Sequence, residues 1–433
     1  MKQQRIHSPS LPGPENIKRF ELGNGSVLLC LNNTNSSSFY MIGLLKAASK
    51  FDGSNKTGLA DFTASMLSRG TENRNFNQIH EILESAGASL GFNASTQNTW
   101  FSGRALAEDL PMLVDLAADC LMHPTFPVEY MERMRAQALT SLAIREQDTG
   151  EMASMAVDKL LFPDHPYGEP VDGYTQTIQA ITQQDLIDFH RSFYSPVEMI
   201  LVIVGGVSAA QTLEQVNRFL GEWTFKEKHE MLGIPPITQL EKTVRKHIEI
   251  PEKSQTNLIM GCQGPARPSE DFLPIHLGND ILGQFGMMGR IGEAVRAKAG
   301  LAYYASSSLN SWMDCGVWEV SAGVNPQNTG KAIELITDEL KKFTSQPVSA
   351  EELQDSKSHL VGRLALSLES NAGLANAIMG MEHFHFGLDY YQRYAGLINA
   401  ITADQIIDSS RKYLVMDKIA IVSAGTMAKK DKR

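Results

Sequence analysis

The chain has 433 residues, with 39 lysines and arginines against 49 aspartates and glutamates, so its formal net charge is −10 at pH 7. At about 100–200 residues per domain, this length predicts two to four folding units, and a composition 42% apolar and 20% charged is that of a globular rather than a disordered protein. The acidic balance excludes electrostatic attraction to nucleic acid or to an anionic membrane as the basis of function.

No segment of the sequence has the length and composition of a membrane span or a secretory signal. The longest apolar run, Met199 to Val204, is far shorter than the ~20 residues that a membrane helix needs. No apolar stretch follows Met1–Arg5. We therefore expect a cytoplasmic protein as the sequence is written, or a periplasmic one if a signal peptide has been removed. The four cysteines are far apart and form no C-x-x-C motif, which favours reduced core thiols.

The first half of the chain alternates short strands with longer helices. In order, the pattern predicts a hairpin over 20–31 around Asn24-Gly25, a strand over 39–46, helices over 58–69 and 75–85, strands over 88–94 and 99–105, mostly helix as far as Phe193, and a last strand over 199–204. Hairpins combined with separate helices predict an α+β fold whose sheet is mainly antiparallel.

The second half repeats the first. The segment Ile181 to Asp188, which continues into a buried strand ending at Gly205, returns as Ile401 to Asp408 and a strand ending at Gly425. Both the start and the closing glycine are displaced by 220 residues (401 − 181 and 425 − 205). Each copy is typical of a helix capped by threonine and followed by a buried strand. An internal duplication explains this order.

The duplication divides the chain into two homologous halves. A further helical stretch, Glu129 to Gln137, pairs with Glu351 to His359 at an offset of 222 (351 − 129). A charged segment with two prolines separates the halves and is typical of an extended linker. We therefore expect an N-terminal domain over 1–226, a linker over 227–243 and a homologous C-terminal domain over 244–433.

Generic catalytic motifs are missing from the sequence. There is no G-x-S-x-G, no Walker loop and no H-E-x-x-H. His80-Glu81 begins the last of these motifs, but Glu84 stands where its second histidine should be, so a solvated helix face is favoured. Two histidines in Glu382 to His385 are two positions apart and cannot converge from one helix face.

Two segments carry a family resemblance that extends over almost the whole chain. Gly58-Leu59-Ala60-Asp61-Phe62-Thr63-Ala64-Ser65-Met66-Leu67 resembles the zinc-site helix, G-L-A-H-F-x-E-H-M-L, of the pitrilysin and mitochondrial processing peptidase family of inverzincins. Further matches are Leu161 to Gly168, Gly205-Gly206 and Gly300 to Tyr303. The resemblance implies two similar α+β halves and a zinc peptidase ancestry.

By that resemblance, the zinc-binding and catalytic groups of the family are absent. Its two zinc histidines correspond to Asp61 and Ser65, and its general-base glutamate corresponds to Ala64. The third ligand, 76 residues further on (141 − 65), corresponds to Ser141. Zinc sites use at least three protein donors, and only Asp61 is one. We therefore predict no metal, no cofactor and no catalytic residue in this chain, with zinc expected only in a partner subunit.

The second segment keeps the residues that family members use to bind the main chain of a substrate. The stretch Val295 to Tyr303 resembles the family pattern L-R-E-K-x-G-L-A-Y, which assigns substrate contact to Arg296 and Tyr303. Arginine supplies a charged planar fork of donors, and a tyrosine hydroxyl can donate to a developing oxyanion. Tyr304 is expected to be structural on the opposite strand face. Arg290, preceded by Gly289 instead of the family's serine, is also expected to be structural.

The resemblance implies the non-catalytic, substrate-binding subunit of a two-chain zinc peptidase that acts on peptides or unfolded segments. Its partner would be a zinc-bearing homologous subunit, or a second copy of this chain. One alternative is a scaffold protein without a substrate, which predicts a tight homodimer or a large assembly. Another is an independent hydrolase with an unrecognised site, which predicts metal-free activity of the isolated chain.

Overall fold

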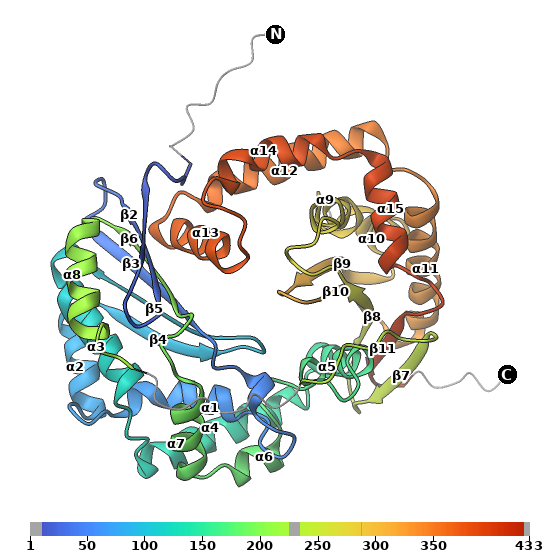
Figure 1. Cartoon of the computed structure of the whole chain (residues 1–433). Coiled ribbons are helices and arrows are strands. Elements are labelled where there is room, and N and C mark those ends of the chain that lie inside the picture. Colours follow the sequence, from blue (N-terminus) through green and yellow to red (C-terminus); the bar gives the residue numbers. More distant parts are fainter. Residues whose placement is uncertain (1–10, 225–233, 287, 428–433) are drawn as a thin grey trace. The chain divides into compact units, whose positions relative to one another are not determined.

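The computed structural model describes residues 11–224, 234–286 and 288–427 (Figure 1). The segment Met1–Arg5, residues 227–233 of the predicted linker and the C-terminal residues from 428 onward lie outside the described residues. Among the helices within the described ranges, none is long and apolar enough to cross a bilayer. All four cysteines are buried and free, which confirms the prediction of core thiols.

The described chain forms two compact units, and each unit contains segments from both halves of the sequence. The first unit comprises residues 11–140, 170–224 and 364–394, and the second comprises 141–169, 234–286, 288–363 and 395–427. Three of the unit boundaries fall within helices: α4 (Val128–Arg145), α12 (Ala350–Ser367) and α14 (Tyr390–Ala400). Each half of the sequence thus contributes one segment to the unit built around the other half's sheet.

The first unit is built on a mainly antiparallel sheet with the strand order β1-β2-β6-β3-β5-β4. Its strands are β1 (Ile17–Glu21), β2 (Val27–Asn32), β3 (Ser38–Leu45), β4 (Ser89–Ala94), β5 (Thr99–Leu106) and β6 (Ile200–Gly205). Its complete helices are α1 (Leu59–Met66), α2 (Phe76–Ser85), α3 (Leu110–Met122), α6 (Thr175–Ala180), α7 (Gln183–Phe193), α8 (Ala209–Leu220) and α13 (Asn371–His383). The predicted hairpin around Asn24-Gly25 is the pair β1–β2.

Helices cover both faces of this sheet, as Figure 1 shows for α3 and α8 against α13. The central strand β6 is buried along nearly its whole length, as expected for a strand packed on two sides. On one face α13, which comes from the second half of the sequence, contacts β3 and β6. The Arg19 guanidinium of β1 holds this helix through Glu382, with Nη2 to Oε1 at 2.9 Å.

The second unit has a sheet with the strand order β7-β11-β8-β10-β9. Its strands are β7 (Val244–Glu249), β8 (Thr256–Gly264), β9 (Ala302–Ser311), β10 (Gly316–Val324) and β11 (Ala420–Gly425). Its complete helices are α5 (Thr149–Leu161), α9 (Phe272–Gly283), α10 (Gly289–Gly292), the π-helical segment η5 (Glu293–Lys298), α11 (Thr329–Ser345) and α15 (Ala403–Tyr413). Neighbouring residues of β10 serve opposite faces: Trp318 meets Phe343 of α11, whereas Val317 joins the core with Val157 of α5.

The two sheets confirm the α+β fold and the duplication. The order β2-β6-β3-β5-β4 of the first sheet matches β7-β11-β8-β10-β9 of the second, and β1 is an additional edge strand. The two predicted threonine caps are also equivalent. Thr182 Oγ1 accepts the N–H of Asp185, and Thr402 Oγ1 accepts the N–H of Gln405, both at 3.2 Å. The matching strand orders make β4 and β9 equivalent edge strands. β9 contains Tyr303, one of the two residues predicted to contact substrate.

Candidate functional site

The helix that resembles a zinc-site helix, α1, is fixed at its N-terminus by a buried carboxylate. Asp52 Oδ2 accepts the N–H of Gly58 and Asp52 Oδ1 accepts the N–H of Ala60, both at 2.8 Å. These bonds satisfy amide groups that a helix cannot satisfy internally. Gly58 has φ 99°, and a β-carbon there would lie 2.6 Å from Ile178 Cδ1. A glycine is therefore required at the start of this helix.

The positions equivalent to zinc ligands lie on the less buried side of α1. Asp61 and Ser65, four residues apart and thus on one face, are half-buried, whereas Ala64 is fully buried. The Ser65 hydroxyl donates to the carbonyl oxygen of Phe62 at 2.9 Å. The side chain at Ala64 reaches no solvent, and that of Ser65 is engaged by its own helix.

The environment of Asp61 disfavours a negative charge. Burial, and then the neighbouring Asp172 carboxylate, raise the pKa of Asp61 to about 6, although the N–H of Ala94 opposes the shift. Burial also raises the pKa of Tyr194, with Asp61 and Asp52 adding to the effect. A metal ion would have the opposite effect on Asp61, because a cation favours the ionised carboxylate.

The fourth position, Ser141, does not complete a metal site. It is an exposed residue of α4, and a neutral serine hydroxyl is not among the thiolate, imidazole and carboxylate donors that zinc uses. Across the described ranges, no three His, Cys, Asp or Glu side chains are grouped so that they could hold a metal ion. The residues at the family's zinc position therefore do not fit zinc.

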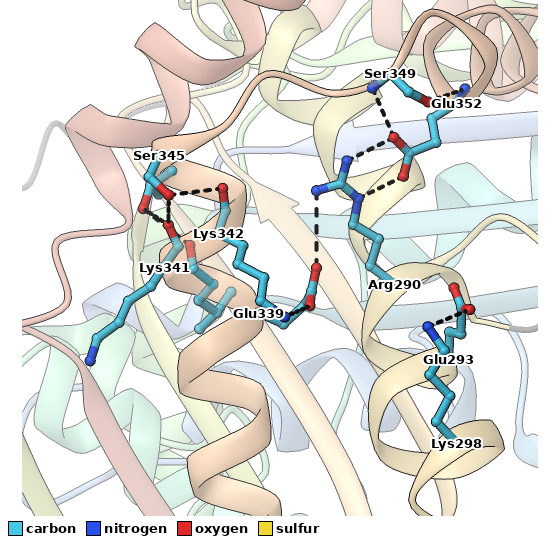
Figure 2. A network of polar contacts seen from close by, with 11 residues as sticks. Arg290, Glu293, Lys298, Glu339, Lys341, Lys342, Ser345, Ser349 and Glu352 are labelled. Carbon is cyan, nitrogen blue, oxygen red and sulfur yellow. Dashed lines mark hydrogen bonds and ion pairs between the residues drawn. The ribbon is translucent and has the colours of Figure 1, made fainter.

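The second segment begins with an arginine that is fully engaged in structure. Arg290, in α10, donates to Glu352 through Nε at 2.6 Å and Nη2 at 2.7 Å, and its Nη1 lies 4.0 Å from Glu339 Oε1 (Figure 2). These bonds from Arg290 lower the pKa of Glu352 to about 2. The contacts agree with the expectation that Arg290 is structural.

Arg296 lies on η5, seven residues before Tyr303. It is half-buried, and its guanidinium has neither an ion pair nor a hydrogen bond with any residue that the structure describes. Gly300, with φ 63°, ends the segment: its N–H donates to the carbonyl of Arg296, and the N–H of Leu301 donates to that of Val295, both at 3.0 Å. This closure is a glycine-ended helix terminus. It turns the chain directly into β9.

Tyr303 projects from β9 because the strand contains a bulge at this residue. Tyr304 pairs with Gly323 and Ala302 pairs with Val324, so Tyr303 has no partner in the register. Bulges interrupt strand pairing and redirect side chains, and they are common beside active sites. The Tyr303 side chain is 82% exposed, the most exposed of the large apolar and aromatic residues described. A free arginine and a free tyrosine thus stand on either side of one turn.

Tyr304, in contrast, is held by the sheet. Its hydroxyl donates to Asn257 Oδ1 at 3.3 Å, and its ring lies across Gly323, where a β-carbon would come within 2.6 Å of Tyr304 Cε1. These contacts agree with the expected structural role. The expectation that Tyr303 and Tyr304 lie on opposite strand faces assumes regular alternation, and the bulge interrupts that alternation.

Two acidic residues were not found by sequence reasoning. Asp158 of α5 and Glu319 of β10 are both half-buried on the α5 side of the second sheet. Burial raises the pKa of each to about 7, and the charge of Asp158 adds to the shift of Glu319. Glu319 is an acidic residue in a strand where alternate residues are apolar, and this pattern is a sequence signal for a buried carboxyl group. Asp158 had none, because its partner comes from the other half of the chain.

Two family profiles match the chain in succession. Residues 28–173 match "Insulinase (Peptidase family M16)" and residues 180–360 match "Peptidase M16 inactive domain". Together they cover 146 and 181 residues, which is 327 of 433. The chain belongs to peptidase family M16. This result confirms the family predicted from the zinc-site helix and the second-half pattern.

Proteins from other organisms resemble the chain along most of its length. An uncharacterized zinc protease of Streptomyces coelicolor is 27% identical over 330 residues, covering 74% of this chain and 70% of that protein. Another, from Bacillus subtilis, is 24% identical over 354 residues, covering 82% and 85%. The crystal structure of a peptidase M16 inactive domain from Pseudomonas fluorescens superposes with a TM-score of 0.89 at 26% identity, covering 96% of this chain and 99% of that one.

Proposed function

We propose that this chain is the non-catalytic, substrate-binding subunit of a two-chain M16 zinc peptidase that acts on peptides or unfolded segments. The observation that carries the proposal is the contrast between two sets of residues. The zinc-ligand positions hold Asp61, Ser65 and Ser141, and the general-base position holds Ala64, whereas the predicted substrate residues are present and have free functional groups. Membership of a family that includes zinc proteases supports a role in proteolysis.

In this proposal, Arg296 and Tyr303 bind the main chain of a polypeptide. The guanidinium of Arg296 presents a planar fork of donors to a carbonyl oxygen. The hydroxyl of Tyr303 donates to the same or a neighbouring oxygen, and its bond strengthens as negative charge develops there. Hydrolysis takes place on the zinc of a partner M16 subunit, and this chain contributes orientation and charge stabilisation.

The strand that carries Tyr303 supports binding of an extended chain. β9 is one of the two edge strands of the second sheet, so one side of its backbone has no neighbouring strand in that sheet. Extended peptides bind such edges by adding a strand, with main-chain hydrogen bonds supplying affinity. The bulge at Tyr303 interrupts the edge and places a hydroxyl donor beside it. Because this arrangement binds the main chain, it suits extended peptides of varied sequence.

The test is peptide cleavage by the two-chain enzyme. This chain is co-expressed with a zinc-bearing M16 subunit, and kcat/KM is measured for an unstructured peptide with wild type, Arg296→Ala and Tyr303→Phe. Loss of a charged donor to the transition state predicts a fall of about 100-fold for Arg296→Ala, and loss of a neutral hydroxyl donor predicts a fall of about tenfold for Tyr303→Phe. The isolated chain is expected to be inactive.

The matched controls lie in the same segment. Lys298→Ala removes a charge two residues from Arg296, but Lys298 already pairs with Glu293, Nζ to Oε1 at 2.9 Å. Tyr304→Phe removes the neighbouring hydroxyl. Both are expected to leave kcat/KM within about twofold. Unchanged cleavage in Arg296→Ala and Tyr303→Phe, with a stable complex, would favour a scaffold role, and peptide cleavage by the pure chain would favour an independent hydrolase.

A further inference from the structure

A cavity lies in the second unit, between the end of α9, the α10–η5 segment and the first turns of α12. Its volume is about 370 Å³, near the lower end of the range for small-molecule sites. Ile281, Phe285 and Ala297 give it an apolar wall, and Glu351, Asp355 and Ser356 of α12 line another part. Neither Arg296 nor Tyr303 lines it. It is therefore separate from the proposed substrate residues.

Two of the charged groups at this cavity are neutralised by partners. Arg290 is the cation that lines it, and that guanidinium is bound by Glu352 and approached by Glu339 (Figure 2). Glu293, also in the lining, pairs with Lys298 (Figure 2). These pairs leave the protein no spare positive charge on the cavity wall.

Two carboxylates remain without a partner. Glu351 and Asp355 are both exposed at the cavity, and neither forms an ion pair or a side-chain hydrogen bond within the part of the chain that the structure covers. They are four residues apart on α12, a spacing at which like charges repel each other on a helix. The helix N-terminus favours Glu351 in its first turn, but Asp355 lies beyond that turn.

A buried hydroxyl provides the second, independent sign of a ligand. Ser356 is fully buried, lines the cavity, and its Oγ has no hydrogen-bond partner among the described residues. A serine in a helix usually bonds to a carbonyl one turn earlier, and a buried polar group without a partner costs about 1–3 kcal/mol. The unused Oγ can accept a hydrogen bond from a bound N–H group.

We propose that this cavity binds a small organic cation with an aliphatic stem and an ammonium or guanidinium group. The apolar wall accommodates the stem, and the cationic end donates to the carboxylates of Glu351 and Asp355 and to Ser356 Oγ. Long basic side chains and polyamines share this combination of an apolar stem and a charged head. The donor set does not suit a metal ion, because the described residues group no three metal-ligating side chains here.

The experiment is calorimetric titration of the full chain with two probes, spermidine and a blocked arginine amide. Tighter binding of spermidine identifies a free polyamine as the source of the cation, and tighter binding of the arginine probe identifies a basic side chain of a polypeptide. In either case, Glu351→Gln with Asp355→Asn is expected to weaken binding about tenfold or more, and Ser356→Ala about threefold to tenfold.

The control double variant is Glu334→Gln with Asp338→Asn on α11. These two residues are also exposed and four positions apart, so the change in net charge and spacing is the same. Since a chain with net charge −10 attracts any polycation, this control separates a site from general attraction. Equal weakening by the two double variants, or no saturable binding of either probe by the wild-type chain, would overturn the proposal.

Discussion

Helix α1 of the first unit and the η5–β9 segment of the second differ in how their polar side chains are used. In α1, Ser65 bonds to its own helix and Ala64 is enclosed. In η5–β9, Arg296 has no partner among the described residues and Tyr303 is 82% exposed. The first set has been absorbed into the internal packing of its unit, whereas the second set remains available.

Under the proposed function, this difference separates structural residues from substrate-binding residues within one chain. A polar group that a protein needs only for stability is normally hydrogen-bonded within the fold. Arg290 and Arg296 show the distinction six residues apart, because one is bound by two glutamates and the other is free. Substitutions in α1 and in the η5–β9 segment test this difference. Those at structural residues should change mainly stability, and those at substrate-binding residues should change mainly cleavage.

The largest expected effect is at Ala64, where restoring the family's glutamate should be destabilising. Ala64 has no exposed surface, so Ala64→Glu adds four heavy atoms beyond the β-carbon and a charge without a partner inside a packed region. We expect the free energy of unfolding in urea to fall by about 3 kcal/mol or more.

Ser65→Glu is the control for Ala64→Glu, since it brings the same charge to the neighbouring, half-buried position. It is expected to cost less than about 1 kcal/mol, mostly through repulsion with Asp61 one turn away. If both variants were equally stable, the space around Ala64 would be open, and the contrast drawn between the two regions would be wrong.

The second prediction compares the two arginines of the second unit. Arg290→Ala removes a half-buried guanidinium and leaves Glu352 and Glu339 without their cation, so we expect a loss of about 2 kcal/mol in the free energy of unfolding. Arg296→Ala removes no intramolecular contact and is expected to stay within about 0.5 kcal/mol of wild type. Urea unfolding of both variants is the measurement, and a larger loss in Arg296→Ala would show that this arginine is structural.

The third prediction concerns the pH dependence of stability through Asp61. Its pKa in the folded chain, about 6, lies above the ordinary value of 3.8, so the unfolded chain ionises first as pH rises. The contribution of Asp61 to the free energy of unfolding is therefore largest below pH 3.8. It declines between pH 3.8 and 6 and does not change further above pH 6. Asp61→Asn should therefore be more stable than wild type by about 1 kcal/mol at pH 7, a value reduced for partial exposure, and should lose this advantage by pH 4.

Ser65→Ala serves as the control for pH, because it changes no titratable group on the same face of α1. Its effect on unfolding should be the same at pH 4 and pH 7. If the difference between Asp61→Asn and wild type also proved independent of pH, the carboxyl of Asp61 would be well solvated, and the enclosed character of this region would have to be rejected.

Much of the fold could be predicted from the sequence because its signals are local. The Thr182 and Thr402 caps and the strand-closing glycines each depend on a few neighbouring residues, and both caps form as predicted. The repeat then implied two equivalent sheets. The family pattern added the identity of Arg296 and Tyr303, which no local signal would distinguish from other surface residues.

Features that depend on distant segments could not be predicted in the same way. Helix α5 packs on the second sheet and α13 packs on the first. A sequence repeat shows which segments are equivalent, but it does not show which segments contact each other, so these placements could not be predicted from it. For the same reason, the proximity of Asp158 to Glu319 had no signal. The bulge that frees Tyr303 arises from a register shift against Gly323 and Val324, and a regular alternation gave no sign of it.

The smallest expected effect on stability distinguishes the adjacent tyrosines. Tyr304→Phe removes one hydrogen bond of 3.3 Å, but Asn257 Oδ1 still accepts from Gln255 Nε2 at 2.7 Å, so the expected cost is only about 0.5 kcal/mol. Tyr303→Phe removes a solvated hydroxyl and should change stability by less than about 0.3 kcal/mol. In cleavage by the two-chain enzyme the order should reverse, because only the exposed hydroxyl can reach a substrate. Thermal unfolding and kcat/KM measured on the same preparations give both orders at once. If only Tyr304→Phe lost activity, the functional hydroxyl would be that of Tyr304. The inference from the exposure of Tyr303 to its function would then be wrong.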